Sequence, residues 1–150
     1  MDPNVLIGML EKASTTFRVI FFLLLVLFVI INLLYYNTLY KTMKAIDPKL
    51  RPFHPALIWL ALLPIIGTLC YMVYAVMLSL SLRKELARRK LNGDGALGVT
   101  LLTVTLFAAV LTLNFNPYLV WSTLVVWLIH WIKIAAYHKR LTESHYLLLD

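Results

Sequence analysis

The 150-residue sequence has few charged residues and a single cysteine, Cys70. One cysteine excludes an intramolecular disulfide framework and a zinc site built from cysteines. Charged residues make up 14% of the chain, about half the share usual for a soluble globular protein. The chain also lacks tracts rich in Gly, Ser or Gln, which together with its 13% aromatic content excludes a disordered protein. A soluble domain of this length could not bury 61% hydrophobic residues, so the composition indicates a membrane protein.

Two long stretches without charged side chains predict transmembrane helices. Residues 19–40 cover roughly 30 Å as a helix, which matches the hydrocarbon core of a bilayer, and form the first expected span. Residues 55–82 form the second, with Pro55 in the first turn, where a helix tolerates proline. We expect a kink at Pro64 and Gly67 in this span, and a cytoplasmic extension of the helix to residue 90.

A third uncharged stretch, from Gly95 to Ile132, is too long for one span. As a single helix it would measure about 57 Å, so it has to turn back. The only turn residues within it are Asn114 to Pro117, because asparagine favours turns and proline cannot continue a helix. The sequence therefore predicts helices at 96–113 and 117–137, and an all-α fold in which residues 1–150 form one membrane domain with a bundle of four transmembrane helices.

The flanking segments complete this architecture. Residues 3–16 carry apolar side chains at helical spacing and predict a short amphipathic helix on the membrane surface, the alternative being a frayed tail. Residues 47–55 contain three prolines, at positions 48, 52 and 55, and this composition predicts an extended loop. Residues 138–150 are expected to be a cytoplasmic tail.

The distribution of lysine and arginine predicts the orientation in the membrane. Four positive residues, Lys41, Lys44, Lys49 and Arg51, follow the first expected span. The other ten lie on the opposite side of the expected bundle, namely Lys12, Arg18, Arg83, Lys84, Arg88, Arg89, Lys90, Lys133, Lys139 and Arg140. Because positively charged loops stay in the cytoplasm, we expect both termini to be cytoplasmic.

The sequence lacks the residues that most intramembrane enzymes and proton-coupled carriers need. No Asp or Glu lies in an expected span, and the His-Glu-x-x-His and Gly-x-Ser-x-Gly motifs are absent. His130 lies well inside a span, whereas His54 and His138 lie at opposite edges, so no pair of haem ligands shares one depth. We therefore expect no enzymatic activity, no cofactor and no metal site.

His130 and Lys133 are the ionisable residues of most interest in the expected spans. They are three residues apart and so share one face of the fourth helix, near Trp127, Trp131 and Tyr137. One interpretation is a polar site that faces the bundle or a subunit interface and contacts an anion or a lipid phosphate. The alternative is that Lys133 extends to the cytoplasmic surface within an aromatic belt while His130 bonds to a neighbouring helix.

Uncharged polar residues in the spans have two interpretations as well. Asn32, Thr103 and Thr105 could line a pore, or could form hydrogen bonds between helices. The segment after the second span is basic, and we expect Glu85 to pair with Arg88 or Arg89 along the helix. The candidate contacts with anionic lipid headgroups are Arg83, Lys84, Arg88, Arg89 and Lys90. A nucleic-acid partner would need a larger basic surface than this segment offers.

Four short segments carry a resemblance to a known family. The segments 55–64, 81–86, 95–98 and 131–137 resemble a family of small, uncharacterised bacterial membrane proteins with a domain of unknown function, over residues 55–141. The chain departs from that family at 65–67, where Ile-Ile-Gly follows Pro64 in place of a Phe-Asn pair. The resemblance implies four spans and a bacterial inner membrane, and it implies no activity, substrate or cofactor.

These observations predict a non-enzymatic integral membrane protein that self-associates or serves as a subunit of a larger membrane assembly. Four short helices leave little room for a water-filled path within one chain. One alternative is an oligomeric channel or transporter whose pore is lined by Asn32, the threonines of the third helix and His130. A second alternative is a lipid-modifying enzyme that uses His130, Lys133 or Tyr137.

Overall fold

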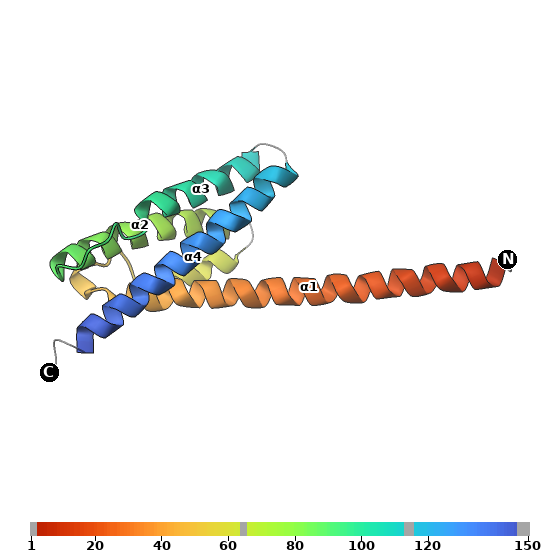
Figure 1. The fold of residues 1–150 in the computed structure, drawn as a ribbon, viewed down its shortest axis with the longest axis horizontal. Helices are drawn as coiled ribbons and strands as arrows, with labels where there is room; N and C mark the ends of the chain where they lie inside the picture. Colours follow the sequence, from red (N-terminus) through yellow and green to blue (C-terminus); the bar gives the residue numbers. More distant parts are fainter. Residues whose placement is uncertain (1–2, 64–65, 113–115, 147–150) are drawn as a thin grey trace. The chain divides into compact units, whose positions relative to one another are not determined.

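The computed structural model of the chain describes residues 3–63, 66–112 and 116–146, with side chains from 14 to 144 within these ranges. The described residues contain helices and no strands, which confirms the all-α prediction (Figure 1). The chain divides into two compact units, residues 1–35 and residues 36–150. The helices are α1 (Pro3–Ala45), η1 (Pro48–Leu50), η2 (Pro55–Leu62), α2 (Ile66–Arg88), α3 (Leu97–Thr112) and α4 (Pro117–Tyr146).

Helix α1 is continuous over both regions that the sequence analysis treats separately, residues 3–16 and 19–40. The prediction of a separate interfacial helix is wrong in this respect, because residues 9–45 contain neither proline nor glycine and nothing ends the helix between them. In the first unit every side chain from Ser14 to Ile30 is exposed. This part of α1 therefore buries no apolar side chain within its own unit.

Three helices of the described residues are long and apolar enough to cross a membrane. The candidate spans are Ser14–Ala45, Ile66–Arg88 and Pro117–Ser144. Helix α3 has 16 residues, about 24 Å at 1.5 Å per residue, which is shorter than the hydrocarbon core. A bundle of four spans therefore stays a prediction.

Residues 55–82 form two helices, η2 and most of α2, that pack against each other as a hairpin, so the prediction of one continuous helix is wrong. The hydroxyl of Tyr74 in α2 donates to the carbonyl of Pro55, at 3.0 Å, although 19 residues separate them. A Cβ on Gly67 would lie only 2.5 Å from the carbonyl oxygen of Ala61, so the two segments approach closely where the chain turns. Leu63 has an extended backbone, with ψ of 134°, as expected for the residue before a proline. The kink expected at Pro64 lies outside the described residues.

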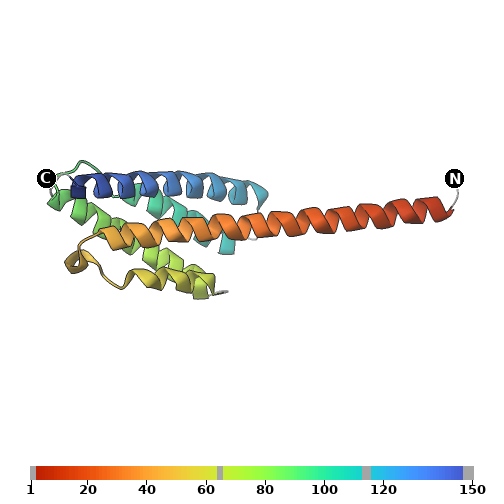
Figure 2. The ribbon, with the colours of Figure 1, turned by 90° about the horizontal axis from the view of Figure 1, so that it is seen from below.

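Helices α3 and α4 form a second hairpin and lie side by side (Figures 1 and 2). Asn116 caps α4, because its side-chain oxygen accepts from the amide of Tyr118 at 3.0 Å, and Pro117 occupies the first turn, as predicted. The residues expected at the turn itself, Asn114 and Phe115, lie outside the described residues. Helix α4 continues past 137 through most of the predicted tail, with Lys139 and Glu143 paired one helical turn apart at 3.8 Å.

The basic segments 41–51 and 83–90 lie at the same end of the second unit. Arg88 pairs with Asp47 at 2.9 Å, and Arg89 donates to the carbonyl of Ala45 at 3.3 Å. The sequence analysis places these segments on opposite sides of the membrane because it takes 55–82 as one span, and that orientation stays a prediction. We call the end formed by residues 41–51, 83–94 and 133–144 the charged end.

Candidate functional site

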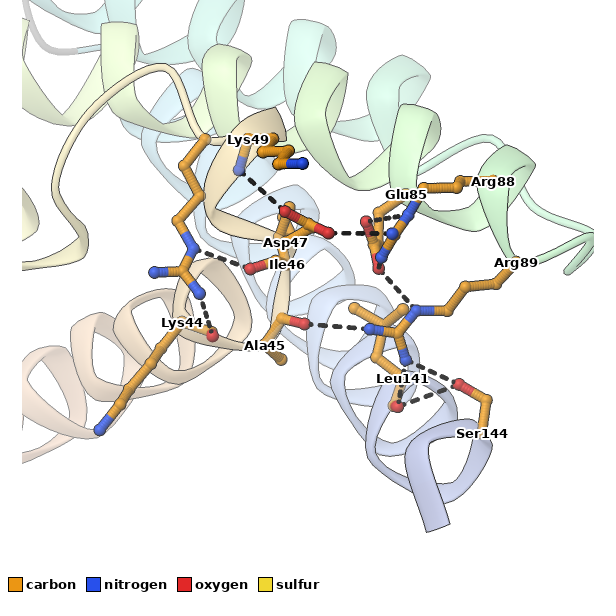
Figure 3. Close-up of polar contacts among 11 residues, drawn as sticks. Lys44, Ala45, Ile46, Asp47, Lys49, Glu85, Arg88, Arg89, Leu141 and Ser144 are labelled. Atoms are coloured by element: carbon orange, nitrogen blue, oxygen red, sulfur yellow. Dashed lines mark hydrogen bonds and ion pairs between the residues drawn. The ribbon is translucent and has the colours of Figure 1, made fainter. Parts of the chain in front are cut away.

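A fully buried carboxylate organises the charged end. Glu85 lies in the last turn of α2 with its side chain 0% exposed, and both of its oxygens bind arginine (Figure 3). Arg88 Nη2 lies 2.7 Å from Glu85 Oε1, and Arg89 Nε lies 2.6 Å from the same oxygen. The expected pairing of Glu85 with the arginines along the helix is thus present, and its carboxylate is buried. Two cations on one buried carboxylate keep its charge compensated.

Arg89 also joins the carboxyl ends of three helices. Its side chain is 12% exposed and donates to the carbonyls of Ala45 in α1 and Leu141 in α4, at 3.3 and 2.9 Å. It donates to Ser144 Oγ at 2.9 Å as well (Figure 3). The last carbonyls of a helix have no partner within the helix and carry partial negative charge. Ala45 is the last residue of α1, so the guanidinium satisfies such a carbonyl there, and the bond to Leu141 ties it to the last turns of α4.

Arg51 and Asp47 complete the cluster from the segment after α1. Arg51 donates through Nε to the carbonyl of Ile46 and through Nη2 to that of Lys44, both at 2.7 Å, and so caps α1. Asp47 Oδ1 accepts from the amide of Lys49 at 2.9 Å. This hydrogen bond, followed by the nearby charge of Arg88, holds the pKa of Asp47 below its ordinary value. The carboxylate therefore stays ionised at the charged end.

A cavity of about 430 Å³ opens among these residues. The segment after α1, the end of α2 and the last turns of α4 supply its walls. One carboxylate, that of Asp47, lines it, together with four positively charged side chains, those of Lys44, Arg51, Arg88 and Arg89. The cavity is therefore basic, and its volume falls within the range of about 300–1,000 Å³ typical of ligand pockets.

A second polar contact at the charged end fixes the loop between α2 and α3. The hydroxyl of Tyr137 in α4 donates to Asp94 Oδ1 at 2.7 Å, and Lys133 Nζ lies 3.9 Å from Asp94 Oδ2. The hydrogen bond from Tyr137 is the main cause that lowers the pKa of Asp94. Next to it, Gly95 has φ of +65°, and a Cβ there would lie 2.6 Å from the carbonyl oxygen of Ser79. Only glycine fits this turn without strain.

A cluster of hydroxyl and imidazole groups lies between the helices. Thr100 Oγ1 in α3 lies 2.6 Å from Ser79 Oγ in α2 and 2.9 Å from His130 Nε2 in α4. Its hydroxyl also donates to the carbonyl of Ala96, at 2.9 Å. Ser79, Thr100 and His130 are fully buried, so α2, α3 and α4 meet around one buried hydrogen-bond network.

The predicted pore residues differ in their surroundings within their own units. His130 and Thr103 are fully buried, and Thr103 donates to the carbonyl of Val99 one turn earlier. Thr105, by contrast, is exposed. Asn32 belongs to the first unit, where its amide donates to the carbonyl of Phe28 at 2.9 Å.

The predicted headgroup contacts divide into two groups. Arg88 and Arg89 line the basic cavity, with Arg89 almost buried. The side chains of Arg83, Lys84 and Lys90 are exposed. The side chain of Lys133 is 44% exposed and reaches toward Asp94, whereas Tyr137 is 9% exposed.

Sequence reasoning paired Glu85 with the arginines but missed its burial and the roles of Asp47 and Asp94 at this end. Asp47 precedes a proline, which is a signal for a capping residue, and it caps η1. Asp94 was recognisable only as part of an Asn-Gly-Asp-Gly turn. Nothing in the sequence indicates that Glu85 is buried or that Arg51 caps α1, because both roles depend on which chain ends meet.

No protein-family model, curated protein or solved structure matches this chain. The resemblance to a family of small bacterial membrane proteins therefore stays a prediction. Within the described residues, no group of three or more His, Cys, Asp or Glu side chains could hold a metal ion.

Proposed function

We propose that this chain is a non-enzymatic integral membrane protein of a bacterial inner membrane that self-associates through its first helix. The observation that carries the proposal is the exposure of α1 in the first unit. Its large apolar side chains are half or more exposed over several turns, as at Phe21 (59%), Phe22 (63%) and Leu23 (60%). Lipid or another apolar helix has to cover such a surface.

Asn32 favours a helix over lipid as one neighbour of this surface. It is the first polar residue after Arg18, and its side chain is partly exposed among exposed leucines and isoleucines. The amide donates one bond within α1, to Phe28, and an asparagine side chain can make up to four hydrogen bonds. Polar side chains of this kind bond between helices in membranes. A second copy of the chain would supply the matching amide.

The proposal includes an orientation. Residues 52–82 and 95–132 contain no Asp, Glu, Lys or Arg, so the charged residues of the second unit belong to its charged end. The positive-inside rule then places the charged end in the cytoplasm. The C-terminal end of α4 is cytoplasmic in this arrangement. If α1 crosses the membrane between Ser14 and Ala45, its amino-terminal end faces the opposite compartment.

In this arrangement η2 and α2 form a re-entrant hairpin. The chain enters the membrane at Pro55 and returns along α2 to the same side, because Tyr74 binds Pro55 and Arg88 binds Asp47. Helices α3 and α4 then form a hairpin that crosses and returns.

The mass of the purified protein in lipid nanodiscs, measured by light scattering, tests self-association. We expect more than one copy per particle. Asn32→Leu should weaken association roughly three- to thirtyfold, since one hydrogen bond between helices contributes about 0.6 to 2 kcal/mol. Thr105→Val, a polar-to-apolar change at an exposed residue of α3, serves as the matched control and should have no effect. A monomer at every protein concentration would contradict the proposal.

Labelling with a membrane-impermeant thiol reagent tests the orientation. In a Cys70→Ala background, single cysteines replace Lys49, Lys90 or Asn116. We expect the first two positions to react from the cytoplasmic side and position 116 from the other side. Opposite sidedness of positions 49 and 90 would rule out the re-entrant hairpin, whatever the oligomeric state.

The two alternatives receive less support from the geometry. A shared pore lined by His130 needs an accessible imidazole, whereas His130 is enclosed within one chain and bonded to Thr100. A lipid-modifying enzyme needs a reactive group within reach of lipid, whereas His130 is enclosed and both Lys133 and Tyr137 are engaged with Asp94. Ion flux through proteoliposomes that disappears on His130→Leu would favour the channel instead.

A further inference from the structure

We propose that the basic cavity at the charged end binds the phosphate group of an anionic phospholipid. The cavity lies where the candidate spans of α1 and α2 end, at Ala45 and Arg88, and both residues line it. Lipid headgroups occupy that level of a membrane protein, and basic cavities between helices on the cytoplasmic side hold anionic headgroups. This inference goes beyond self-association and does not rest on it.

The charges around the cavity favour an anion. Four cationic side chains and the carboxylate of Asp47 line it, and the second carboxylate in contact with these arginines is that of Glu85. Counting both carboxylates still leaves two positive charges in excess. The negatively charged phosphodiester group of an anionic lipid is attracted to this excess, whereas a zwitterionic headgroup carries its own cation into a positive site.

Hydrogen-bond donors remain for a ligand after the helix ends are capped. Arg51 caps α1 through Nε and Nη2, and a guanidinium has five N–H donors, so donors on Nη1 remain beyond those contacts. The side chain of Arg88 is 51% exposed, which leaves part of it open to solvent. Figure 3 shows the side chain of Lys44 directed away from these arginines, so Lys44 contributes positive charge near the cavity rather than a further donor. Arginine forks suit a phosphate.

A neighbouring apolar cavity favours a lipid over a free phosphate ion as the source of this group. Two residues after Arg51, Phe53 lines a second cavity, of about 300 Å³, between η2 and α2. Leu57, Leu60 and Val73 also line it, so its walls are mainly apolar. A phospholipid has a charged headgroup for the basic cavity and acyl chains for the apolar cavity. An inorganic anion would use the basic cavity alone.

Native mass spectrometry of the full-length protein, released from bilayers with equal amounts of phosphatidylglycerol and phosphatidylcholine, tests the proposal. We expect the wild type to retain phosphatidylglycerol selectively. Lys44→Gln should weaken this retention about fivefold and Lys44→Glu about twenty-five-fold, because each positive charge near the headgroups contributes a factor of about five. Lys84→Gln, which neutralises an exposed lysine at the same end but outside the cavity walls, should change it less than twofold.

Lys44 suits this test because its ammonium has no role in capping, so the variants should fold, and circular dichroism checks that they do. Equal retention by wild type and Lys44→Glu would overturn the proposal. An equal effect of Lys44→Gln and Lys84→Gln would also overturn it, because it would indicate general surface attraction only.

A second arm of the experiment distinguishes the two sources of phosphate. Glycerol phosphate and inorganic phosphate are added to the delipidated protein in neutral detergent, and binding is followed by calorimetry. Retention of phosphatidylglycerol without binding of either soluble anion supports a lipid site that needs acyl chains. Binding of the soluble anions that Lys44→Glu abolishes supports the phosphate site and assigns it to a soluble ligand instead.

Discussion

The two buried polar clusters of the second unit use different chemistry at different levels. Glu85 with Arg88 and Arg89 is ionic and lies at the charged end, next to a side chain that is 51% exposed. Ser79, Thr100 and His130 form a cluster of groups without carboxylates in the uncharged part of the helices. The comparison indicates that this chain buries charge only where solvent is near, and joins its helices elsewhere through hydroxyl and imidazole groups.

The cost of desolvation explains the difference. An ion in a low-dielectric interior needs a partner of opposite charge and further hydrogen bonds, and Arg89 receives both from Glu85 and from helix-end carbonyls. A neutral hydroxyl needs only hydrogen bonds, and Thr100 has three neighbours that supply them. The variants below test whether the two clusters differ in this way, from the largest expected effect to the smallest.

Glu85→Ala should give the largest loss of stability, about 3 kcal/mol, because removing one partner of a buried ion pair leaves charge uncompensated. Arg89, at 12% exposure, would keep only hydrogen bonds to neutral groups. Denaturant unfolding in detergent micelles, followed by tryptophan fluorescence, measures the change. Lys84→Ala on the neighbouring exposed position is the control and should change stability by less than about 0.5 kcal/mol. A loss below about 1 kcal/mol for Glu85→Ala would contradict the importance given to the ionic cluster.

Thr100→Val should destabilise the protein by about 1 to 2 kcal/mol, because it removes the shared partner of Ser79 and His130 with little change in volume. The matched control is Thr103→Val, at a buried threonine of the same helix whose hydroxyl bonds to Val99 in its own helix. The same unfolding measurement applies to both. If the two variants lose equal stability, the bonds between helices add nothing to those within α3.

Tyr137→Phe should raise the pKa of Asp94 toward its ordinary value of 3.8, because the hydroxyl bond lowers it in the wild type. In the wild type the unfolded chain has the higher pKa at this carboxyl. Its contribution to stability is therefore present above about pH 4 and lost as the pH falls through the folded-state value. Carboxyl chemical shifts of Asp94 between pH 2 and 6 measure the pKa in both proteins. An unchanged pKa in Tyr137→Phe would show that another group holds this carboxylate.

Lys139→Gln should have the smallest effect, below about 0.5 kcal/mol, although it removes an ion pair. Lys139 and Glu143 are 78% and 61% exposed, and exposed pairs contribute little because water and salt screen them. Unfolding at low and at 0.5 M salt measures the difference. A loss comparable to that of Glu85→Ala would break the distinction between buried and exposed charge at this end.

The sequence predicted some elements well because their signals are local. Asn116 followed by Pro117 is a helix start that involves only neighbouring residues, and α4 begins there. The first helix was recognisable from its apolar residues, and its continuity follows from the absence of proline and glycine after Gly8. The basic cavity had no such signal, because its walls come from residues about 40 to 100 positions apart along the chain.

The error over residues 55–82 shows where local signals end. Length and hydropathy make this stretch equally suitable for one span or for a hairpin. Whether the chain folds back depends on the close contact of Gly67 with the backbone of Ala61. The orientation depends on the same contact, since it brings the segment after α1 to the end of α2.

By itself the sequence determined that this protein is helical and has long segments apolar enough for a membrane, because both follow from composition and spacing along the chain. Only the tertiary structure decided that Glu85 is buried, that His130 bonds to Thr100 and that the basic segments surround one cavity. The physical reason is that burial and electrostatic pairing depend on distances between segments remote in sequence, which packing alone sets.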